Sequence, residues 1–262
     1  MDMLISAFVC THVGKVRKNN EDNFFLQGLT LDRGIMNKGF ARTCESAEAV
    51  QLYAVCDGMG GQAAGEEASS IGVSLLRPLL AQLCDGGVVR ACVNRYADDA
   101  NKAVVALPTD SGSTLVMLVI NNGFATVAWL GDSRAYMLRD RRLIRLTEDH
   151  TEAERMKKLG ITPKGGRASN SLTRYLGMDM QDLVITPSYT DDIRLKRKDV
   201  FLLCSDGLYN MVDEDKISDI LIHSDSPARE LAEAALENGG TDNITALVAD
   251  VSKLSKPLFG AK

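Results

Sequence analysis

The stretch Thr114–Arg139, TLVMLVINNGFATVAWLGDSRAYMLR, decides the fold class of this chain. It contains three runs of strand length, Thr114–Ile120, Phe124–Leu130 and Arg134–Arg139, which are rich in apolar and β-branched residues. Asn121-Asn122-Gly123 separates the first two runs, and Asn-Gly supplies the positive φ that a tight hairpin turn requires. Consecutive strands joined by such short turns pair antiparallel, so the stretch predicts an antiparallel sheet.

Further strands are predicted on both sides of this stretch. A second hairpin turns at Asp140-Arg141-Arg142, before the short run LIRLT. The other runs of apolar and β-branched residues predict the strands Leu4–His12, Gln51–Cys56, Val200–Cys204 and Asn243–Val251.

Helices are predicted between these strands. Apolar residues three or four apart indicate helices over residues 68–83 and 89–107, and Pro78 should kink the first because it lacks an amide donor. Thr151 and Glu154 form a capping box that opens a short helix ending at Gly160, followed by a loop over residues 160–171. The last two helices are predicted to begin at Asp213 and at Ser226-Pro227, the latter ending at Gly239.

Hairpins dominate this order, and helices do not alternate strictly with strands. The pattern therefore favours an α+β fold of antiparallel sheets covered by helices over a doubly wound parallel sheet. No linker or repeat divides the 262 residues, so we expect a single domain over residues 1–262.

Composition excludes several classes of protein. The chain is 45% hydrophobic and 25% charged, which argues against disorder. Its longest apolar run, Leu115 to Ile120, is far too short for a membrane helix, and its first residues lack the basic region of a signal peptide. The net charge of −5 argues against a general nucleic-acid binder. The six cysteines form no C-x-x-C pair, and Cys56 and Cys204 lie in apolar runs, so we expect reduced thiols in a cytoplasmic protein.

Acidic residues lie repeatedly beside apolar strands. Asp57-Gly58, Gly131-Asp132 and Ser205-Asp206-Gly207 each follow such a run, Asp242 precedes the last strand, and Glu21-Asp22 precedes an aromatic pair. Carboxylates at strand ends can meet at one edge of a sheet, where their mutual repulsion is relieved by a divalent cation. An oxygen-only ligand set suits Mg²⁺ or Mn²⁺ rather than zinc or copper.

Two further residues fit a phosphoryl-transfer site. Gly58 lacks a side chain, so a backbone carbonyl there could approach a metal. Arg17 lies four residues before Glu21 and is a candidate phosphate clamp, because a guanidinium binds phosphate oxygens bidentately. Two cations a few Å apart can activate water and hold a phosphoryl group.

At these residues the chain resembles the PP2C (PPM) family of metal-dependent serine/threonine protein phosphatases, in its compact bacterial form. The matching segments follow the family order from residue 14 to residue 245. They are Gly14-x-x-Arg17-x-x-Asn20-Glu21-Asp22, Asp57-Gly58-Met59-Gly60-Gly61, Ser113-Thr114, Gly131-Asp132-Ser133-Arg134-Ala135-Tyr136, Leu146-Thr147-Glu148-Asp149-His150, Leu172-Thr173-Arg174-Tyr175-Leu176-Gly177, Ser205-Asp206-Gly207-Leu208 and Thr241-Asp242-Asn243-Ile244-Thr245.

The resemblance implies a four-layer α-β-β-α sandwich, with a helix pair outside each of two antiparallel sheets. It also implies two Mn²⁺ or Mg²⁺ ions in a core site, a third ion near Asp132, and direct attack of a metal-bridging hydroxide on phosphoserine or phosphothreonine. By the same resemblance, a flap over about residues 151–177 flanks the site. The implied ligands of the core ions are Glu21, Asp57, the Gly58 carbonyl, Asp206 and Asp242. Asp132 and Asp206 are the implied ligands of the third ion. Asp22 is expected to support the ligand shell around Glu21.

The resemblance also assigns catalytic roles and partners. Arg17 would orient the substrate phosphate, and Asp57 and Asp206 would carry catalysis through the ions. Asn243 is expected to fix its loop rather than bind metal. The implied partners are phosphoproteins made by a cognate kinase, with no nucleic acid or membrane, and we expect a monomer.

One residue departs from the animal-type pattern. Met59 stands where those enzymes carry a histidine proposed as the general acid. A metal-bound water is our first candidate for the proton donor, and His150 is the second.

Three other functions are alternatives to this one. A catalytically inactive scaffold remains an alternative, although the retained Glu21, Asp57, Asp206 and Asp242 argue against it. Gly58-x-Gly60-x-x-Ala63 suggests a dinucleotide site, but two helices separate it from the next predicted strand, so no compact βαβ unit exists. A two-metal nuclease would need a basic groove, whereas the most basic stretches fit solvated turns.

Overall fold

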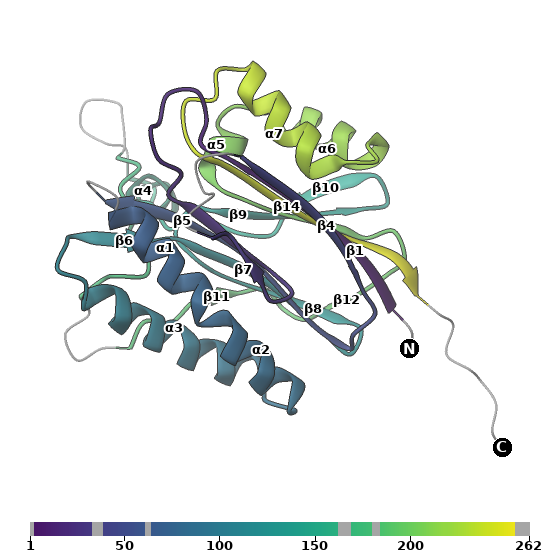
Figure 1. Cartoon of the computed structure of the whole chain (residues 1–262), viewed down its shortest axis with the longest axis horizontal. Coiled ribbons are helices and arrows are strands. Elements are labelled where there is room, and N and C mark those ends of the chain that lie inside the picture. Colours follow the sequence, from purple (N-terminus) through teal and green to yellow (C-terminus); the bar gives the residue numbers. More distant parts are fainter. Residues whose placement is uncertain (1–2, 33–38, 61–63, 162–168, 180–183, 255–262) are drawn as a thin grey trace.

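Two antiparallel sheets lie face to face between two layers of helices (Figure 1). The computed structural model describes residues 3–32, 39–60, 64–161, 169–179 and 184–254. Helices α5, α6 and α7 cover one sheet, and helices α1, α2 and α3 cover the other. The predicted α+β sandwich is therefore confirmed.

The first sheet, in its described strands, has the order β10-β9-β13-β14-β1-β4, and every neighbouring pair is antiparallel. The short hairpin β9–β10 turns at Asp140 and Arg141, both at positive φ. Strand β4 lies at the end of this sheet, so one of its edges pairs with β1 and the other with no described strand. The strands are β1 (Met3–His12), β4 (Phe40–Ser46), β9 (Arg134–Arg139), β10 (Arg142–Arg145), β13 (Val200–Cys204) and β14 (Ile244–Leu254).

The second sheet has the order β11-β8-β7-β5-β2-β3, with β12 also paired to β8 and β6 to β5. The predicted hairpin between β7 and β8 is confirmed, because Asn121 pairs with Phe124 and both Asn122 and Gly123 have positive φ. The strands are β2 (Asp22–Leu26), β3 (Leu29–Thr30), β5 (Val50–Gly60), β6 (Ser111–Ser113), β7 (Leu115–Asn121), β8 (Phe124–Leu130), β11 (Ser188–Tyr189) and β12 (Ile193–Arg194).

Helices α4 and α6 begin at the capping residues that the sequence indicates. Thr151 caps α4 by accepting the Glu154 N–H, and Asp213 caps α6 by accepting the Lys216 N–H. Pro227 occupies the first turn of α7, where its missing donor costs nothing. The helices are α1 (Ala64–Ser74), α2 (Leu76–Cys84), α3 (Val89–Val105), α4 (Glu152–Lys158), α5 (Asp206–Tyr209), α6 (Glu214–His223) and α7 (Pro227–Glu237).

Three predictions about local structure need correction. The single kinked helix over residues 68–83 is two helices, which break at Leu75, because the Pro78 ring clashes with the carbonyl four residues earlier. Asp57 and Gly58 do not follow a strand but lie within β5. Residues 22–26, predicted only as a buried aromatic pair, form strand β2, because two buried faces hide the alternation of a strand.

Apolar side chains fill three layers. One cluster lies between the sheets, and one lies between each sheet and its helices. In the described part of the chain, no helix is long and apolar enough to span a membrane. The predicted flap region holds α4 and residues 169–177, whereas part of the predicted loop, residues 162–168, lies outside the described residues.

Candidate active site

A pocket of about 250 Å³ collects most of the predicted site residues from distant parts of the sequence. It lies where the end of β5 meets the start of α5 and the loop before β14. Its lining comprises Arg17, Glu21, Asp57, Gly58, Met59, Gly60, Thr114, Asp132, Leu172, Asp206, Asp242 and Asn243.

Asp57 and Gly58 are held by hydrogen bonds to Thr114 on one side and Glu21 on the other. The Asp57 N–H donates to Thr114 Oγ1 at 3.0 Å, and the Thr114 N–H donates to the Asp57 carbonyl at 2.8 Å. The Gly58 N–H donates to the Glu21 carbonyl at 3.1 Å. A Cβ on residue 58 would lie 2.0 Å from the Gly65 carbonyl oxygen, so only glycine allows α1 to start this close to β5.

Asn243 joins the segment carrying Arg17 and Glu21 to the loop carrying Asp242. Its Nδ2 donates to the Val13 and Asn19 carbonyls, each at 2.9 Å, and its Oδ1 accepts the Glu21 N–H at 2.8 Å. These bonds agree with the prediction that Asn243 fixes its loop.

Arg17 and Asp206 face this loop. Arg17 Nη2 donates to Asp242 Oδ2 at 2.6 Å, although half of the Arg17 side chain is exposed. Asp206 is the first residue of α5, and its Oδ2 accepts from Asn210 Nδ2 at 3.2 Å. Arg17 therefore lies beside the carboxylates with its remaining donors available at the surface.

Asp22 is the one predicted metal residue that does not line the pocket. It is fully buried and pairs with Asp57 across strands β2 and β5. Its Oδ2 accepts from Ser205 Oγ and Thr245 Oγ1, each at 2.7 Å, whereas its Oδ1 has no partner. The structure thus places Asp22 beneath the pocket, and its two hydroxyl partners were not recognised in the sequence.

The carboxylates of the site resist ionisation. Burial, followed by the charges of neighbouring carboxylates, raises the pKa of both Asp132 and Asp206 to about 6. The pKa of Asp57 is raised for the same two reasons, with Asp22 the largest of the neighbouring charges. Burial also raises the pKa of Glu21, although Arg17 opposes this shift. Such a cluster favours a bound cation, which offsets the repulsion.

The donor set fits a hard divalent cation, because the pocket offers carboxylates and no imidazole or thiol. Gly58 has no Cβ, and the tight packing around it leaves no room for one. Within the described ranges, no three His, Cys, Asp or Glu side chains already converge as the ligands of an ion do. Side-chain rotation of these half-buried carboxylates would accompany binding.

His150 does not line the pocket and has another role. Its Nδ1 accepts the Gly131 N–H at 3.1 Å, and its ring stacks on Trp129. Burial and the nearby Arg174 lower its pKa to about 4. The second candidate for the proton donor is therefore a neutral side chain that shapes the turn before Asp132.

Sequence reasoning missed the network behind Asp132. Tyr209 donates from its hydroxyl to the Asp132 carbonyl at 3.1 Å, and the Arg134 guanidinium lies 3.5 Å from the Tyr209 ring centroid. Arg134 also binds Asp149 through two nitrogens. Arg134 and Asp149 belong to recognised motifs, but nothing in the sequence places Tyr209 against them.

Comparison with known proteins identifies the family. The model of the family described as protein phosphatase 2C matches residues 10–244. The serine/threonine phosphatase stp of Listeria welshimeri is 30% identical over 94% of this chain and 96% of its own length. The serine/threonine protein phosphatase PstP of Mycobacterium tuberculosis is 32% identical over 91% of this chain, which spans 43% of that protein.

Solved structures agree. The crystal structure of the M. tuberculosis phosphatase PstP superposes with a TM-score of 0.77 at 30% identity, covering 95% of this chain and all of that one. A PstP catalytic domain described in complex with two manganese ions gives a TM-score of 0.74 at 31% identity, again over 95% of this chain and all of that one. The family match spans far more than half of the sequence and includes the segments that build the pocket. The chain therefore belongs to the protein phosphatase 2C family and is a serine/threonine protein phosphatase.

Proposed function

We propose that the carboxylate pocket is the active site and that it hydrolyses phosphoserine and phosphothreonine in proteins with the help of two divalent cations. One observation carries this proposal. Acidic side chains from segments as distant as Glu21 and Asp242 line one pocket, where burial and then the charges of neighbouring carboxylates raise the pKa of several of them.

Five groups would hold the two ions. They are the side chains of Glu21, Asp57, Asp206 and Asp242 and the carbonyl of Gly58. Asp132, which shares the pocket with Asp206, would hold a third ion more weakly. When bound, such ions withdraw electron density from phosphoryl oxygens and make water a better nucleophile near neutral pH. Manganese is supported by the two-manganese complex described for PstP.

The chain's own groups then have separate tasks. Arg17 would bind the phosphate oxygens, since a guanidinium matches them bidentately and Arg17 already lies beside Asp242. Asp22 would orient the ligand shell from below, because its Oδ2 is fixed by two hydroxyls. Asn243 would hold Glu21 and Asp242 close together, because it accepts the Glu21 N–H and donates its own N–H to Asp242 Oδ1.

No cysteine is suited to act as a nucleophile here. Burial raises the pKa of both Cys56 and Cys204 to about 12, so both remain thiols at neutral pH. Neither lines the pocket. This supports direct attack by water rather than a phosphoenzyme.

The proton for the leaving hydroxyl would come from water. Met59 lines the pocket but carries no titratable group, and His150 is neutral and lies outside it. Leu172 brings the segment after α4 into the pocket, so this region is placed to contact the substrate beside its phosphate. We further propose that the protein is a cytoplasmic monomer acting on the products of a serine/threonine kinase.

Hydrolysis of a phosphothreonine peptide with Mn²⁺, with Mg²⁺ and with EDTA tests the proposal. We expect turnover with either metal and none with EDTA. Folded protein that binds Mn²⁺ but hydrolyses no phosphopeptide would overturn it and favour an inactive scaffold.

A further inference from the structure

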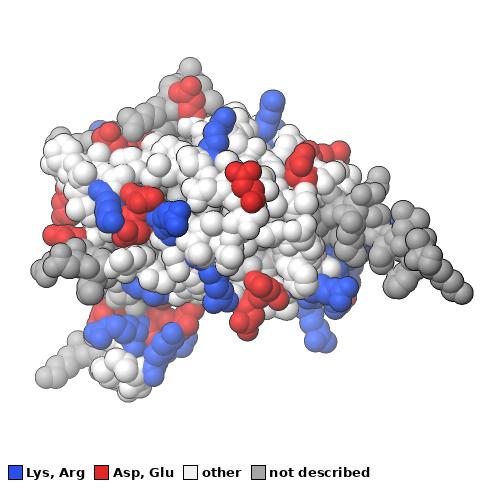
Figure 2. Space-filling view, turned by 90° about the horizontal axis from the view of Figure 1, so that it is seen from below, with Lys and Arg blue, Asp and Glu red and all other residues white. Residues whose placement is uncertain are grey.

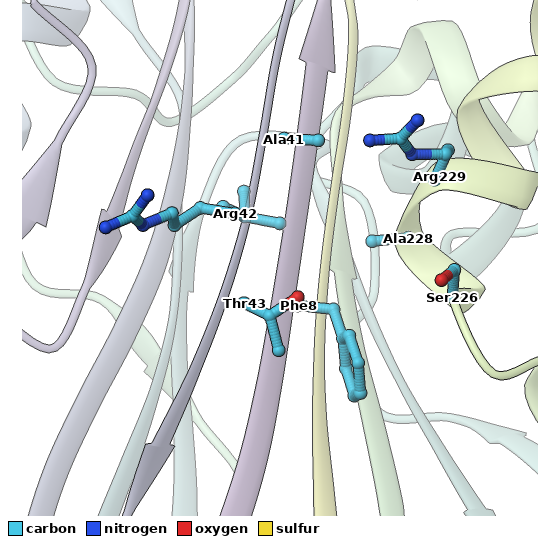
Figure 3. A pocket seen from close by; sticks show the side chains of 8 residues that line it. Phe8, Ala41, Arg42, Thr43, Ser226, Ala228 and Arg229 are labelled. Atoms are coloured by element: carbon cyan, nitrogen blue, oxygen red, sulfur yellow. The ribbon is translucent and has the colours of Figure 1, made fainter.

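A second pocket, of about 260 Å³, lies on the outer face of the first sheet, between strand β4 and helix α7 (Figure 3). None of its lining residues is acidic, although the chain as a whole carries a net charge of −5. Besides Val9 and Ala228, its lining is Phe8, Ala41, Arg42, Thr43, Ser226 and Arg229.

Two arginines flank this pocket, one on each face of the β4 edge. Arg42 and Arg229 are exposed, and the side chain of neither forms a hydrogen bond or salt bridge with another residue in the described part of the chain. Arg229 points from α7 toward Ala41, whereas Arg42 points to the other side of β4, away from the helix (Figure 3). Such a pair of free guanidinium groups complements carboxylates.

The edge of β4 supplies a template for an extended chain. Its pairing with β1 uses one edge, and no described strand pairs with the other. Residues 41–43 are exposed along this strand. An exposed sheet edge offers backbone N–H and C=O groups to an incoming strand, whose side chains alternate between the two faces.

These two features together specify the occupant. In an added strand, the residue opposite Arg42 shares its face, and the residues on either side point toward α7 and Arg229. Two consecutive acidic residues therefore meet one arginine each. Strand β4 itself, FARTCES, carries one acidic residue and no consecutive acidic pair, and residues 255–262 of this chain carry two lysines and no acid, so neither a second copy of β4 nor that segment matches this charge pattern.

The position of the pocket connects it with the catalytic site. Val9 pairs with Arg42 on one side and with Leu247 on the other, and Asp242 lies five residues before Leu247. With about 3.3 Å per residue and about 4.8 Å between strands, an added strand opposite Arg42 lies roughly 22 Å from Asp242, the span of about seven extended residues.

We infer that the β4 edge and its two arginines form a docking site for an acidic, extended segment of the phosphoprotein substrate, about seven residues from the phosphorylated residue. The inference rests on the proposed phosphatase activity and deepens it, because it names a substrate feature outside the phosphate. Binding there lowers KM without changing kcat, since no group of the pocket touches the reacting atoms.

The test compares phosphothreonine peptides that differ in one feature. One set carries Asp-Glu seven residues before or after the phosphothreonine, a second carries Asn-Gln there, and a third carries Asp-Glu only three residues away. We expect KM to be about five- to tenfold lower for one of the two peptides whose Asp-Glu lies seven residues from the phosphothreonine than for its Asn-Gln counterpart. Two exposed ion pairs can provide a difference of this size.

Variants identify the origin of this preference. Arg42→Glu and Arg229→Glu, singly and together, should abolish it, and the double variant should instead prefer a Lys-Lys peptide. Arg229 lies in the first turn of α7, where glutamate is tolerated, and Arg95→Glu on α3 is the matched control. Every second amide of an added strand points toward β4. N-methylation of that set of amides in the acidic segment should therefore weaken docking, whereas N-methylation of the other set should not.

The outcomes separate the two proposals. If no variant hydrolyses a short phosphothreonine peptide, the proposed activity fails. If all variants hydrolyse it equally but the acidic preference is absent, or persists unchanged in the double variant, the docking site is refuted.

Discussion

His150 makes the stability of this protein depend on pH in a way that can be calculated. The Gly131 N–H donates to His150 Nδ1 at 3.1 Å, and Nε2 lies 2.8 Å from Arg174 Nη2 and 3.0 Å from Ser188 Oγ, so a protonated ring would stand beside the Arg174 guanidinium. Burial, then the charge of Arg174, lowers the pKa of His150 from 6.5 to about 4. The folded protein therefore binds a proton less readily than the unfolded chain.

The sign and size of the effect follow from this difference. Above pH 6.5 His150 is neutral in both the folded and the unfolded state, so its lowered pKa does not reduce the free energy of unfolding. As the pH falls from 6.5 toward 4, the unfolded chain takes up the proton first, and the free energy of unfolding decreases. At pH 5 the two pKa values give a loss of about 2 kcal/mol in the free energy of unfolding from this residue alone.

Urea unfolding at pH 7.5 and pH 5.0, in EDTA so that metal binding does not contribute, measures this loss. We compare the wild type with His150→Asn, whose side-chain oxygen can still accept the Gly131 N–H. His223→Asn, at an exposed position at the end of α6, is the matched control. We expect the wild type and the control to lose about 2 kcal/mol more than His150→Asn between the two pH values. Equal losses in all three proteins would refute the assignment of His150 as a buried neutral residue.

Three substitutions in the pocket give further predictions. Asp206→Asn should reduce Mn²⁺-dependent hydrolysis of a phosphothreonine peptide by about 100-fold or more while the circular dichroism spectrum is unchanged, and full activity would contradict the ligand assignment. Arg17→Lys keeps the charge but loses the bidentate geometry, so KM should rise severalfold with no change in thermal stability; an unchanged KM would exclude phosphate binding by Arg17. Gly58→Ala places a Cβ 2.0 Å from the Gly65 carbonyl oxygen and should cost about 1–3 kcal/mol in urea unfolding, so wild-type stability would refute the close approach of α1.

The surface on the side of α2 and α3 carries both signs of charge intermixed (Figure 2). This is the distribution of a solvated face rather than of a continuous basic patch, and it agrees with the low net charge that argued against nucleic-acid binding. The two unpaired arginines beside β4 differ from this pattern because no acidic residue lines their pocket.

Local chemistry explains which elements could be predicted from the sequence. The β7–β8 hairpin depends on Asn122-Gly123 at positive φ, and α4 and α6 depend on caps within three residues of their starts. Strand β4, with its mostly exposed FARTCES, was not predicted, because an edge strand with polar side chains on both faces has no hydrophobic alternation. Pro78 predicts a kink within one helix, whereas the structure has a break at Leu75, because the clash acts on the preceding turn rather than at the proline itself.

The sequence by itself determined the antiparallel sandwich, the family and the identity of the acidic residues, because turns, caps and motifs are encoded in short contiguous segments. Only the tertiary structure decided how those residues divide between roles. It brought Glu21, Asp57, Asp206 and Asp242 to one pocket, placed Asp22 beneath it, and removed His150 from it. Burial and neighbouring charge set these roles, and both depend on which strands lie side by side, a relation between residues as far apart as Asp22 and Thr245.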